Sequence, residues 1–215
     1  MVFQFLDVIL HLDKYLQTFA TEYSVMAYIL IFLIIFFETG VVITPFLPGD
    51  SLLFVAGALA AVGSFKIGIL FIIIFVAAVL GDAMNYHIGK FIGPRIFVKE
   101  SSLLFNKGYL VRAQKFYEKH GKETIILARF VPVIRTFAPF VAGIGKMSYR
   151  IFLAYNVLGA LLWCILFLFG GFLFGNIPFV KENLSLLILA IVILSIIPFL
   201  KEAIKHLVLK KRDWR

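Results

Sequence analysis

Four charged residues interrupt stretches of sequence that are otherwise almost entirely apolar. Glu38 and Asp50 enclose Thr-Gly-Val-Val-Ile-Thr-Pro-Phe-Leu-Pro-Gly, and Arg129 and Arg135 enclose Phe-Val-Pro-Val-Ile. A charge at membrane depth is costly and usually faces a cavity or a partner, so each of the four is a candidate functional residue. Prolines and glycines that interrupt helices accompany both pairs, and this combination is typical of a transport site built from broken helices.

The composition predicts an all-α integral membrane protein with a single membrane domain. Of 215 residues, 62% are hydrophobic and 15% are charged. The net charge is +9, but the positive residues lie between apolar segments, which indicates topology and contact with anionic lipid rather than with nucleic acid. The single cysteine, Cys164, excludes a disulfide within the chain. The N-terminus lacks the pattern of a cleaved signal peptide, so we expect it to remain.

The first half of the chain predicts a helix at the membrane surface, a re-entrant hairpin and a transmembrane helix. Residues 1–22 mix apolar and polar side chains as an interfacial amphipathic helix does. Residues 24–63 form two apolar pieces, each shorter than the roughly 20 residues that a span requires, so we prefer a hairpin to one long kinked span. Residues 66–89 are long enough to cross. The helix-breaking residues of this hairpin are Pro45, Pro48 and Gly49.

The second half repeats this order in the opposite orientation, which predicts an inverted repeat of two hairpins, each followed by a transmembrane helix. Its helix-breaking residues are Pro132 and Pro139. Its segments are a cytoplasmic basic amphipathic linker at 90–122, a second hairpin at 123–146, transmembrane helices at 150–175 and 184–204, and a basic tail at 205–215. The positive-inside rule places the linker and the C-terminus in the cytoplasm.

The two hairpins are expected to bring their broken tips together near the membrane midplane, around a wet or protein-lined cavity. Arg129 and Arg135 present forked donors suited to an anionic headgroup, phosphate above all. Glu38 and Asp50 would balance the arginines when no substrate is bound, and could carry protons. We expect Glu38 to be the better proton-coupling residue and Asp50 the more structural or ion-pairing one, because Asp50 begins a helix.

Other interpretations of these residues stay open. Asp50 could serve only as a helix N-cap, and Glu38 with the arginines could form a buried ion pair that fixes the fold without transport. A secondary group is expected to make interhelical hydrogen bonds or to meet headgroups. Its members are Asp82, Asn85, His87, Tyr155 and Asn156. For Asp82, Asn85 and His87, a proton relay is the alternative. No histidine shows metal-ligand spacing, and we expect neither a metal nor a cofactor.

Several motifs together resemble the DedA family, whose shared region is also called the VTT or SNARE-associated domain. They lie at 37–40, 46–53, 81–86, 116–121, 128–143 and 155–163. The resemblance covers about residues 20–180 and implies a bacterial inner-membrane protein with two facing re-entrant hairpins. It also implies a role in envelope maintenance linked to the proton motive force, with members that recycle undecaprenyl phosphate. The family's required acids match Glu38 and Asp50, and its required arginines match Arg129 and Arg135.

We therefore predict a transporter or flippase that moves an anionic lipid, with undecaprenyl phosphate as the expected substrate, between leaflets. Its expected partners are membrane lipids, including a polyprenyl phosphate, and protons; a homo-oligomer is compatible with the sequence. The alternatives are a proton-coupled antiporter of a soluble cation or drug, and a non-transporting membrane scaffold. No nucleophile lies at a usable spacing from a base, so we do not expect an enzyme.

Overall fold

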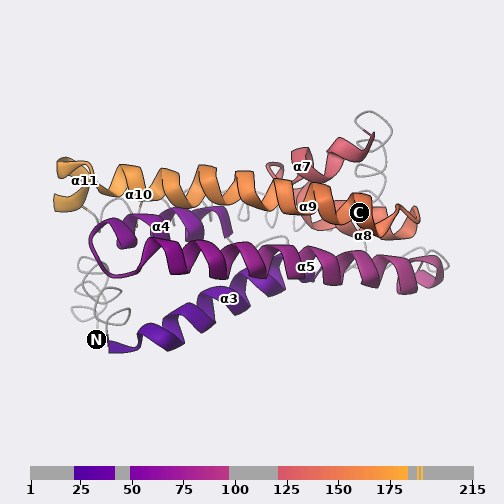
Figure 1. Ribbon diagram of the computed structural model, residues 1–215, viewed down its shortest axis with the longest axis horizontal. Coiled ribbons are helices and arrows are strands. Elements are labelled where there is room, and N and C mark those ends of the chain that lie inside the picture. The colour runs from indigo at the N-terminus through magenta and orange to yellow at the C-terminus, as the bar shows by residue number, and fades with distance from the viewer. Residues whose placement is uncertain (1–21, 42–48, 97–120, 184–187, 189, 191–215) are drawn as a thin grey trace, which may run out of the picture.

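The computed structural model describes residues 22–41, 49–96, 121–183, 188 and 190, and the regular elements of these ranges are all helices (Figure 1). The α-helices are α3 (Ser24–Gly40), α4 (Gly49–Ala61), α5 (Ile67–Ile96), α7 (Thr124–Ala128), α8 (Pro132–Ile144), α9 (Tyr149–Cys164), α10 (Gly170–Gly175) and α11 (Pro178–Glu182). A 3₁₀ turn, η1 (Gly121–Glu123), precedes α7, and a π-helical segment, η2 (Ile165–Phe169), joins α9 to α10. The prediction of an all-helical chain therefore holds for these residues.

Two long helical segments form the centre of the molecule and run in opposite directions (Figure 1). They are Ile67–Phe91, within α5, and Tyr149–Gly175, which comprises α9, η2 and α10. Their 25 and 27 residues exceed the roughly 20 that a membrane span needs, and both are apolar. The ring of Tyr86 lies 5.5 Å from that of Tyr149 at one end, and Phe71 lies 5.8 Å from Phe169 towards the other.

The helices α3 and α4 form an antiparallel pair. Near the start of α3, the Tyr28 ring lies 5.3 Å from Phe65, and the Tyr28 hydroxyl accepts the Lys66 N–H at 2.9 Å. Near its end, Glu38 Oε1 accepts the N–H of Gly49, the first residue of α4, at 3.2 Å. The start of α3 thus lies beside the end of α4, and these are the outer ends of the pair. The end of α3 lies beside the start of α4, and these are the inner ends.

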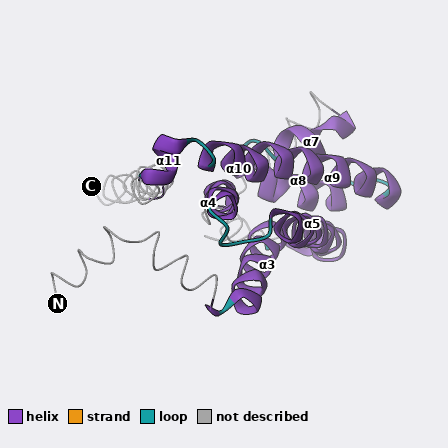
Figure 2. Ribbon diagram, turned by 60° about the vertical axis from the view of Figure 1, so that its left-hand side comes forward, coloured by secondary structure: helices purple, strands orange, loops and turns teal. Residues whose placement is uncertain are grey.

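In the second half of the chain, α7 and α8 form the corresponding pair. The second member of each pair packs on the long segment of the other half of the chain. The helix α4 lies on η2 and α10, where a Cβ on Gly57 would meet the Leu168 carbonyl oxygen at 2.1 Å. The helix α8 lies on α5, where a Cβ on Gly143 would meet the Tyr86 carbonyl oxygen at 2.1 Å. Such close backbone approach requires glycine and is common in membrane helix packing. Figure 2 shows α4 and α8 against these two segments.

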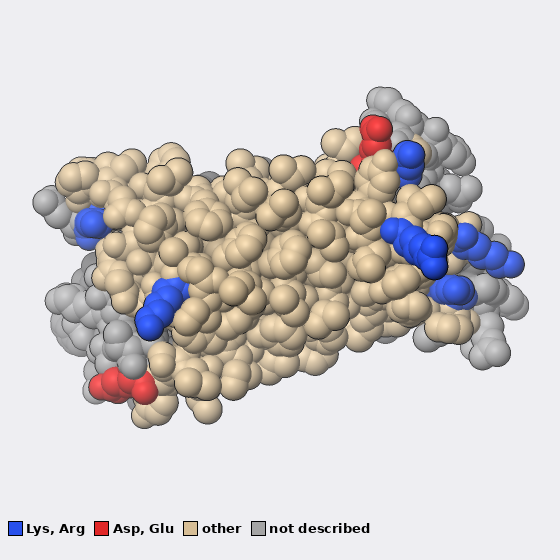
Figure 3. All heavy atoms as spheres, in the orientation of Figure 1, with Lys and Arg blue, Asp and Glu red and all other residues tan. Residues whose placement is uncertain are grey.

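The surface of the bundle has the character of a membrane protein. Large apolar side chains face outward along the long segments; Ile72 is 61% exposed and Leu173 is 68% exposed. Figure 3 shows a face whose broad middle carries neither acidic nor basic residues, whereas charged residues gather at its two ends. An apolar band between charged ends matches a bilayer with its hydrocarbon in the middle and its headgroups on either side.

Some predicted boundaries differ from the observed ones. The helix α5 continues to Ile96, beyond the predicted end at 89, so Lys90 and Arg95 belong to a helix rather than to the linker. Pro139 lies inside α8 and does not break it as predicted, whereas Pro132 is at the first helical position, where proline is favoured. The short connection between the predicted spans at 150–175 and 184–204 contains α11.

Other predictions lie wholly or mostly outside the described residues. They concern the interfacial helix at 1–22, the breakers Pro45 and Pro48, most of the linker at 90–122, the span at 184–204 and the tail at 205–215.

Candidate substrate site between the helix pairs

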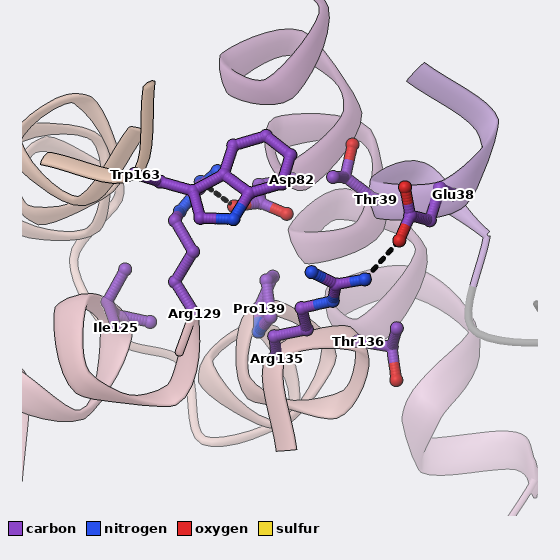
Figure 4. A pocket seen from close by; sticks show the side chains of 9 residues that line it. All are labelled: Glu38, Thr39, Asp82, Ile125, Arg129, Arg135, Thr136, Pro139 and Trp163. Atoms are coloured by element: carbon purple, nitrogen blue, oxygen red, sulfur yellow. Dashed lines mark hydrogen bonds and ion pairs between the residues drawn. The ribbon is translucent and has the colours of Figure 1, made fainter. Parts of the chain in front are cut away.

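The inner ends of the two helix pairs meet around a small cavity between the long segments (Figure 4). The space that the centre of a water-sized sphere can occupy there is about 10 Å³, which is room for about one water molecule. The lining residues are Glu38, Thr39, Asp82, Ile125, Arg129, Arg135, Thr136, Pro139 and Trp163. Three of the four predicted charged residues line this cavity, and the fourth, Asp50, is bonded to Arg135.

Arg135 holds both acids of the first helix pair. Its Nη2 donates to Glu38 Oε1, and its Nη1 donates to Asp50 Oδ1 at 2.5 Å. The Glu38 side chain is fully buried, whereas the Asp50 side chain is 31% exposed. Asp50 lies in the first turn of α4, one residue after Gly49 begins the helix, so it is not only an N-cap. These contacts join α8 to α3 and α4.

Glu38 reaches Arg135 because residue 49 is glycine. A Cβ on Gly49 would lie 1.9 Å from Glu38 Oε2, which is far inside van der Waals contact. The Gly49 N–H also donates to Glu38 Oε1. We predicted Gly49 as a helix breaker; in the structure it begins α4 and also makes room for the carboxylate.

Arg129 has a separate partner. It follows α7, and its Nη2 donates to Asp82 of α5 and, at 2.6 Å, to Asn156 Oδ1 of α9. Asn156 in turn donates from Nδ2 to the Val79 carbonyl at 3.0 Å. We expected Glu38 and Asp50 to balance both arginines; within the described ranges they pair with Arg135 alone, and Asp82 balances Arg129. Asp82 therefore belongs to the site rather than only to helix packing.

Asn85 joins the two helix pairs to α5. Its Nδ2 donates to the Thr39 carbonyl of α3 at 3.1 Å and to the Thr136 carbonyl of α8 at 2.8 Å. Asn85 is fully buried, so these bonds lie in low-dielectric surroundings, where their loss is costly. This is the interhelical hydrogen bonding that we expected of Asn85.

Asp82 is the secondary candidate that lines the cavity, and the two not yet described, His87 and Tyr155, lie outside its lining. The His87 ring lies among aromatic rings, 5.0 Å from Tyr149 and 6.2 Å from Phe91. Tyr155 places its ring 5.8 Å from Lys122 Nζ. Tyr149 begins α9 and Lys122 precedes α7, so these contacts lie towards the outer end of the second helix pair.

Trp163 is a site residue that our sequence reasoning missed. Its indole Nε1–H donates to Asp50 Oδ1 at 2.8 Å, and both arginines lie close to its ring. The motif at 155–163 ends on this residue, but an aromatic side chain in an apolar helix carries no signal that separates a site residue from ordinary packing.

The charges of the site do not cancel when all five groups are ionised. Three carboxylates, from Glu38, Asp50 and Asp82, face two guanidinium groups. Three buried polar atoms of the site also have no hydrogen-bond partner within the part of the chain that is described: Glu38 Oε2, Arg129 Nε and Arg135 Nε. Buried polar groups without partners are unfavourable, so the site retains capacity to bind a polar ligand or a proton.

Comparisons with known proteins agree with a membrane protein. The VTT domain matches residues 47–173. The Escherichia coli protein named DedA is 52% identical over 208 residues, which cover 96% of this chain and 95% of that protein. An uncharacterized membrane protein of Mycobacterium tuberculosis is 46% identical over 175 residues, 80% of this chain and 77% of its own length.

A more distant relative, the inner membrane protein YqjA of Escherichia coli, is 32% identical over 153 residues, 71% of this chain and 70% of that protein. No solved structure matches the chain. The identity, its near-complete coverage and the matched domain together establish the relationship: the chain belongs to the DedA family of membrane proteins, whose shared region is the VTT domain.

Proposed function

We propose that this protein is a transporter that moves an anionic lipid, undecaprenyl phosphate, between the leaflets of the bacterial inner membrane. The observation that carries the proposal is the meeting of Arg129 and Arg135 with three carboxylates at the inner ends of two helix pairs. Buried arginines with planar, forked donors are the side chains best suited to hold a phosphate group in an apolar environment.

The proposed membrane placement is two re-entrant hairpins that enter from opposite sides. The lengths of α3 and α4, 17 and 13 residues, correspond to roughly 25 and 20 Å, less than the roughly 30 Å of hydrocarbon. The exposed Lys90, Lys146 and Arg150 favour a cytoplasmic location for the outer end of the second pair. The cavity would then lie near the midplane, reachable in turn from either side.

Substrate and carboxylates would compete for the same arginine donors. The cavity has room for about one water molecule, so a phosphate group can enter only if the ion pairs open. The Asp50 side chain, at 31% exposed, is the least buried of the three acids and is the one expected to leave Arg135 first. The isoprenoid tail would remain in lipid throughout.

The charge balance supports a link to protons. With three carboxylates and two arginines the empty site carries one excess negative charge, and a phosphate monoester would add roughly 1.5 to 2 more. Protons bound by the carboxylates would offset the added charge. Glu38, which is fully buried beside Arg135, is the carboxylate for which an uncompensated charge costs most.

Reconstitution of the purified protein in liposomes with labelled undecaprenyl phosphate tests the proposal. We expect exchange of the label between leaflets above that of protein-free liposomes, faster with a pH gradient, and lost in Arg135→Gln. Arg150→Gln, at an exposed position, is the matched control and should exchange normally. Exchange by the wild-type protein that does not exceed the protein-free rate would rule out the proposal.

One observation favours the rival antiporter of a soluble cation or drug: the acids outnumber the arginines in the site. That function predicts cation-dependent proton movement in liposomes that lack any polyprenyl phosphate. The same liposomes, prepared with and without the lipid, therefore separate the two functions. A non-transporting scaffold predicts no solute or lipid movement in either preparation.

A further inference from the structure

One buried side chain touches both arginine clusters of the site. Trp163, at the end of α9, is 1% exposed. The Cζ atom of Arg129 lies 5.7 Å from the centroid of its ring, and that of Arg135 lies 5.9 Å away. Its Nε1–H donates to Asp50, which is itself bonded to Arg135. Figure 4 shows the indole in front of the Arg129 guanidinium and close to Arg135.

Each of these contacts has a recognised physical basis. A guanidinium within about 6 Å of an indole centroid is attracted by the ring quadrupole, and more strongly where water is excluded. The indole N–H can only donate, and a bond from it to a carboxylate is charge-assisted. Arginine is long and flexible, whereas tryptophan has two rotatable side-chain bonds and a rigid ring. The indole is thus the rigid element against which the flexible charged side chains are ordered.

The backbone places Trp163 at an irregular point of its helix. The π-helical segment η2 begins two residues later, and Leu168, five residues after Trp163, is also fully buried. Hydrogen bonds in a π turn join residues five apart, so such a turn keeps both side chains directed inward while Ile165 and Leu166 face outward. Isolated π turns inside α-helices are frequent at functional sites.

We propose that Trp163 is the positioning residue of the site, and that it sets the separation and orientation of Arg129 and Arg135 so that one phosphate headgroup receives donors from both. This inference rests on the proposed function. When a phosphate displaces the carboxylates, the arginines keep their place over the ring. Without the indole, the position of each guanidinium is set by its own acid partner alone. The phosphate headgroup then binds only one of the two arginines.

The chain offers a direct spectroscopic test, because it contains two tryptophans, Trp163 and Trp214. In a Trp214→Phe parent, all tryptophan emission arises from Trp163. Titration with farnesyl phosphate should change this emission saturably, whereas farnesol, which has no charge, should not change it. In the substrate-free parent, Arg135→Gln should alter the emission spectrum, because it removes a cation from the ring.

Transport kinetics separate positioning from a merely structural role. Trp163→Phe keeps a ring but loses the N–H, and Trp163→Leu loses both. We expect Trp163→Leu to raise the half-saturating concentration of labelled lipid by about tenfold and Trp163→Phe by about threefold, with maximal rates within about twofold of the parent. Phe174→Leu, at an exposed aromatic of the same long segment, is the control and should change neither parameter.

The possible outcomes separate this inference from the proposed function. Suppose that the wild-type protein exchanges lipid normally, but that neither Arg135→Gln nor farnesyl phosphate changes the emission spectrum of the parent. That result would overturn the role of Trp163 and leave the transport proposal intact. Unchanged half-saturation in Trp163→Leu would overturn it as well. No lipid exchange by the wild-type protein would instead remove the transport proposal. If a Trp163 variant does not fold, the emission measurements on the parent still decide.

Discussion

Arg129 donates to Asp82, a residue 47 positions earlier in the chain, and both side chains are almost fully buried. This pair leaves Glu38 and Asp50 to Arg135. The two arginines, which look alike in the sequence, thus have different partners and different local charge. Substitutions at the two clusters are therefore expected to have different consequences.

Loss of the Asp82 charge should mainly reduce stability. Asp82→Asn leaves the Arg129 guanidinium buried without a counter-ion, and breaking a buried pair in this way costs about 3 to 5 kcal/mol. We expect a lower free energy of unfolding in detergent, measured against Glu123→Gln, an exposed acid. Adding Arg129→Gln should restore part of the lost stability. A double variant no more stable than Asp82→Asn alone would contradict this account.

Arg135 should not tolerate replacement by lysine. It donates through two different nitrogens to Glu38 and Asp50, and the single ammonium of lysine cannot reproduce that fork. We expect Arg135→Lys to reduce the initial rate of lipid exchange by at least about tenfold at equal amounts of protein in the membrane. Arg150→Lys, made at an exposed position, should retain the wild-type rate. A wild-type rate of exchange in Arg135→Lys would show that the site does not need the two-nitrogen fork of arginine.

Gly49→Ala tests the approach of Glu38 to the site. The added carbon would lie 1.9 Å from Glu38 Oε2, so the carboxylate must move away from Arg135. Displacement of a site residue by about 1 Å can cost on the order of a hundredfold in rate, and we expect exchange to fall by at least about tenfold. Gly68→Ala is the matched control, because nothing lies within 4 Å of a Cβ at that position. Equal rates in the two alanine variants would argue against the role of Gly49.

Glu38 and Asp50 should differ in their effect on proton coupling. Glutamine cannot take up a proton, so Glu38→Gln should remove the acceleration of lipid exchange by a pH gradient. Asp50→Asn should lower the rate but keep the acceleration, because Glu38 remains. The measurement is the ratio of exchange rates with and without the gradient in each variant. A wild-type ratio in Glu38→Gln would exclude Glu38 as the coupling residue.

The sequence predicted the charged site because the cost of burying a charge is visible without a structure. Glu38, Asp50, Arg129 and Arg135 each stand out against apolar neighbours, and the structure brings all four together. The partner of each charge depends on how α5 packs against the helix pairs. A local sequence pattern does not predict that packing. Asp82 was for that reason assigned to helix packing and not to Arg129.

Helix ends were predicted less well, for a related reason. Lys90 marks the end of the apolar stretch, but α5 continues to Ile96. A helix forms its backbone hydrogen bonds within itself, so it can extend past the point where its side chains become polar. Pro139 looks like a breaker, yet seven residues of helix precede it in α8, and the surrounding packing on α5 outweighs the missing donor.

The exchange of packing partners between the two halves has a consequence for biogenesis. The Gly57 surface of α4 is covered by η2 and α10, which lie more than a hundred residues later in the chain. Until that segment emerges from the ribosome and inserts, α4 lacks its neighbour, so the N-terminal half cannot mature alone. Two fragments divided within the linker should accumulate only when both are expressed in the same cell.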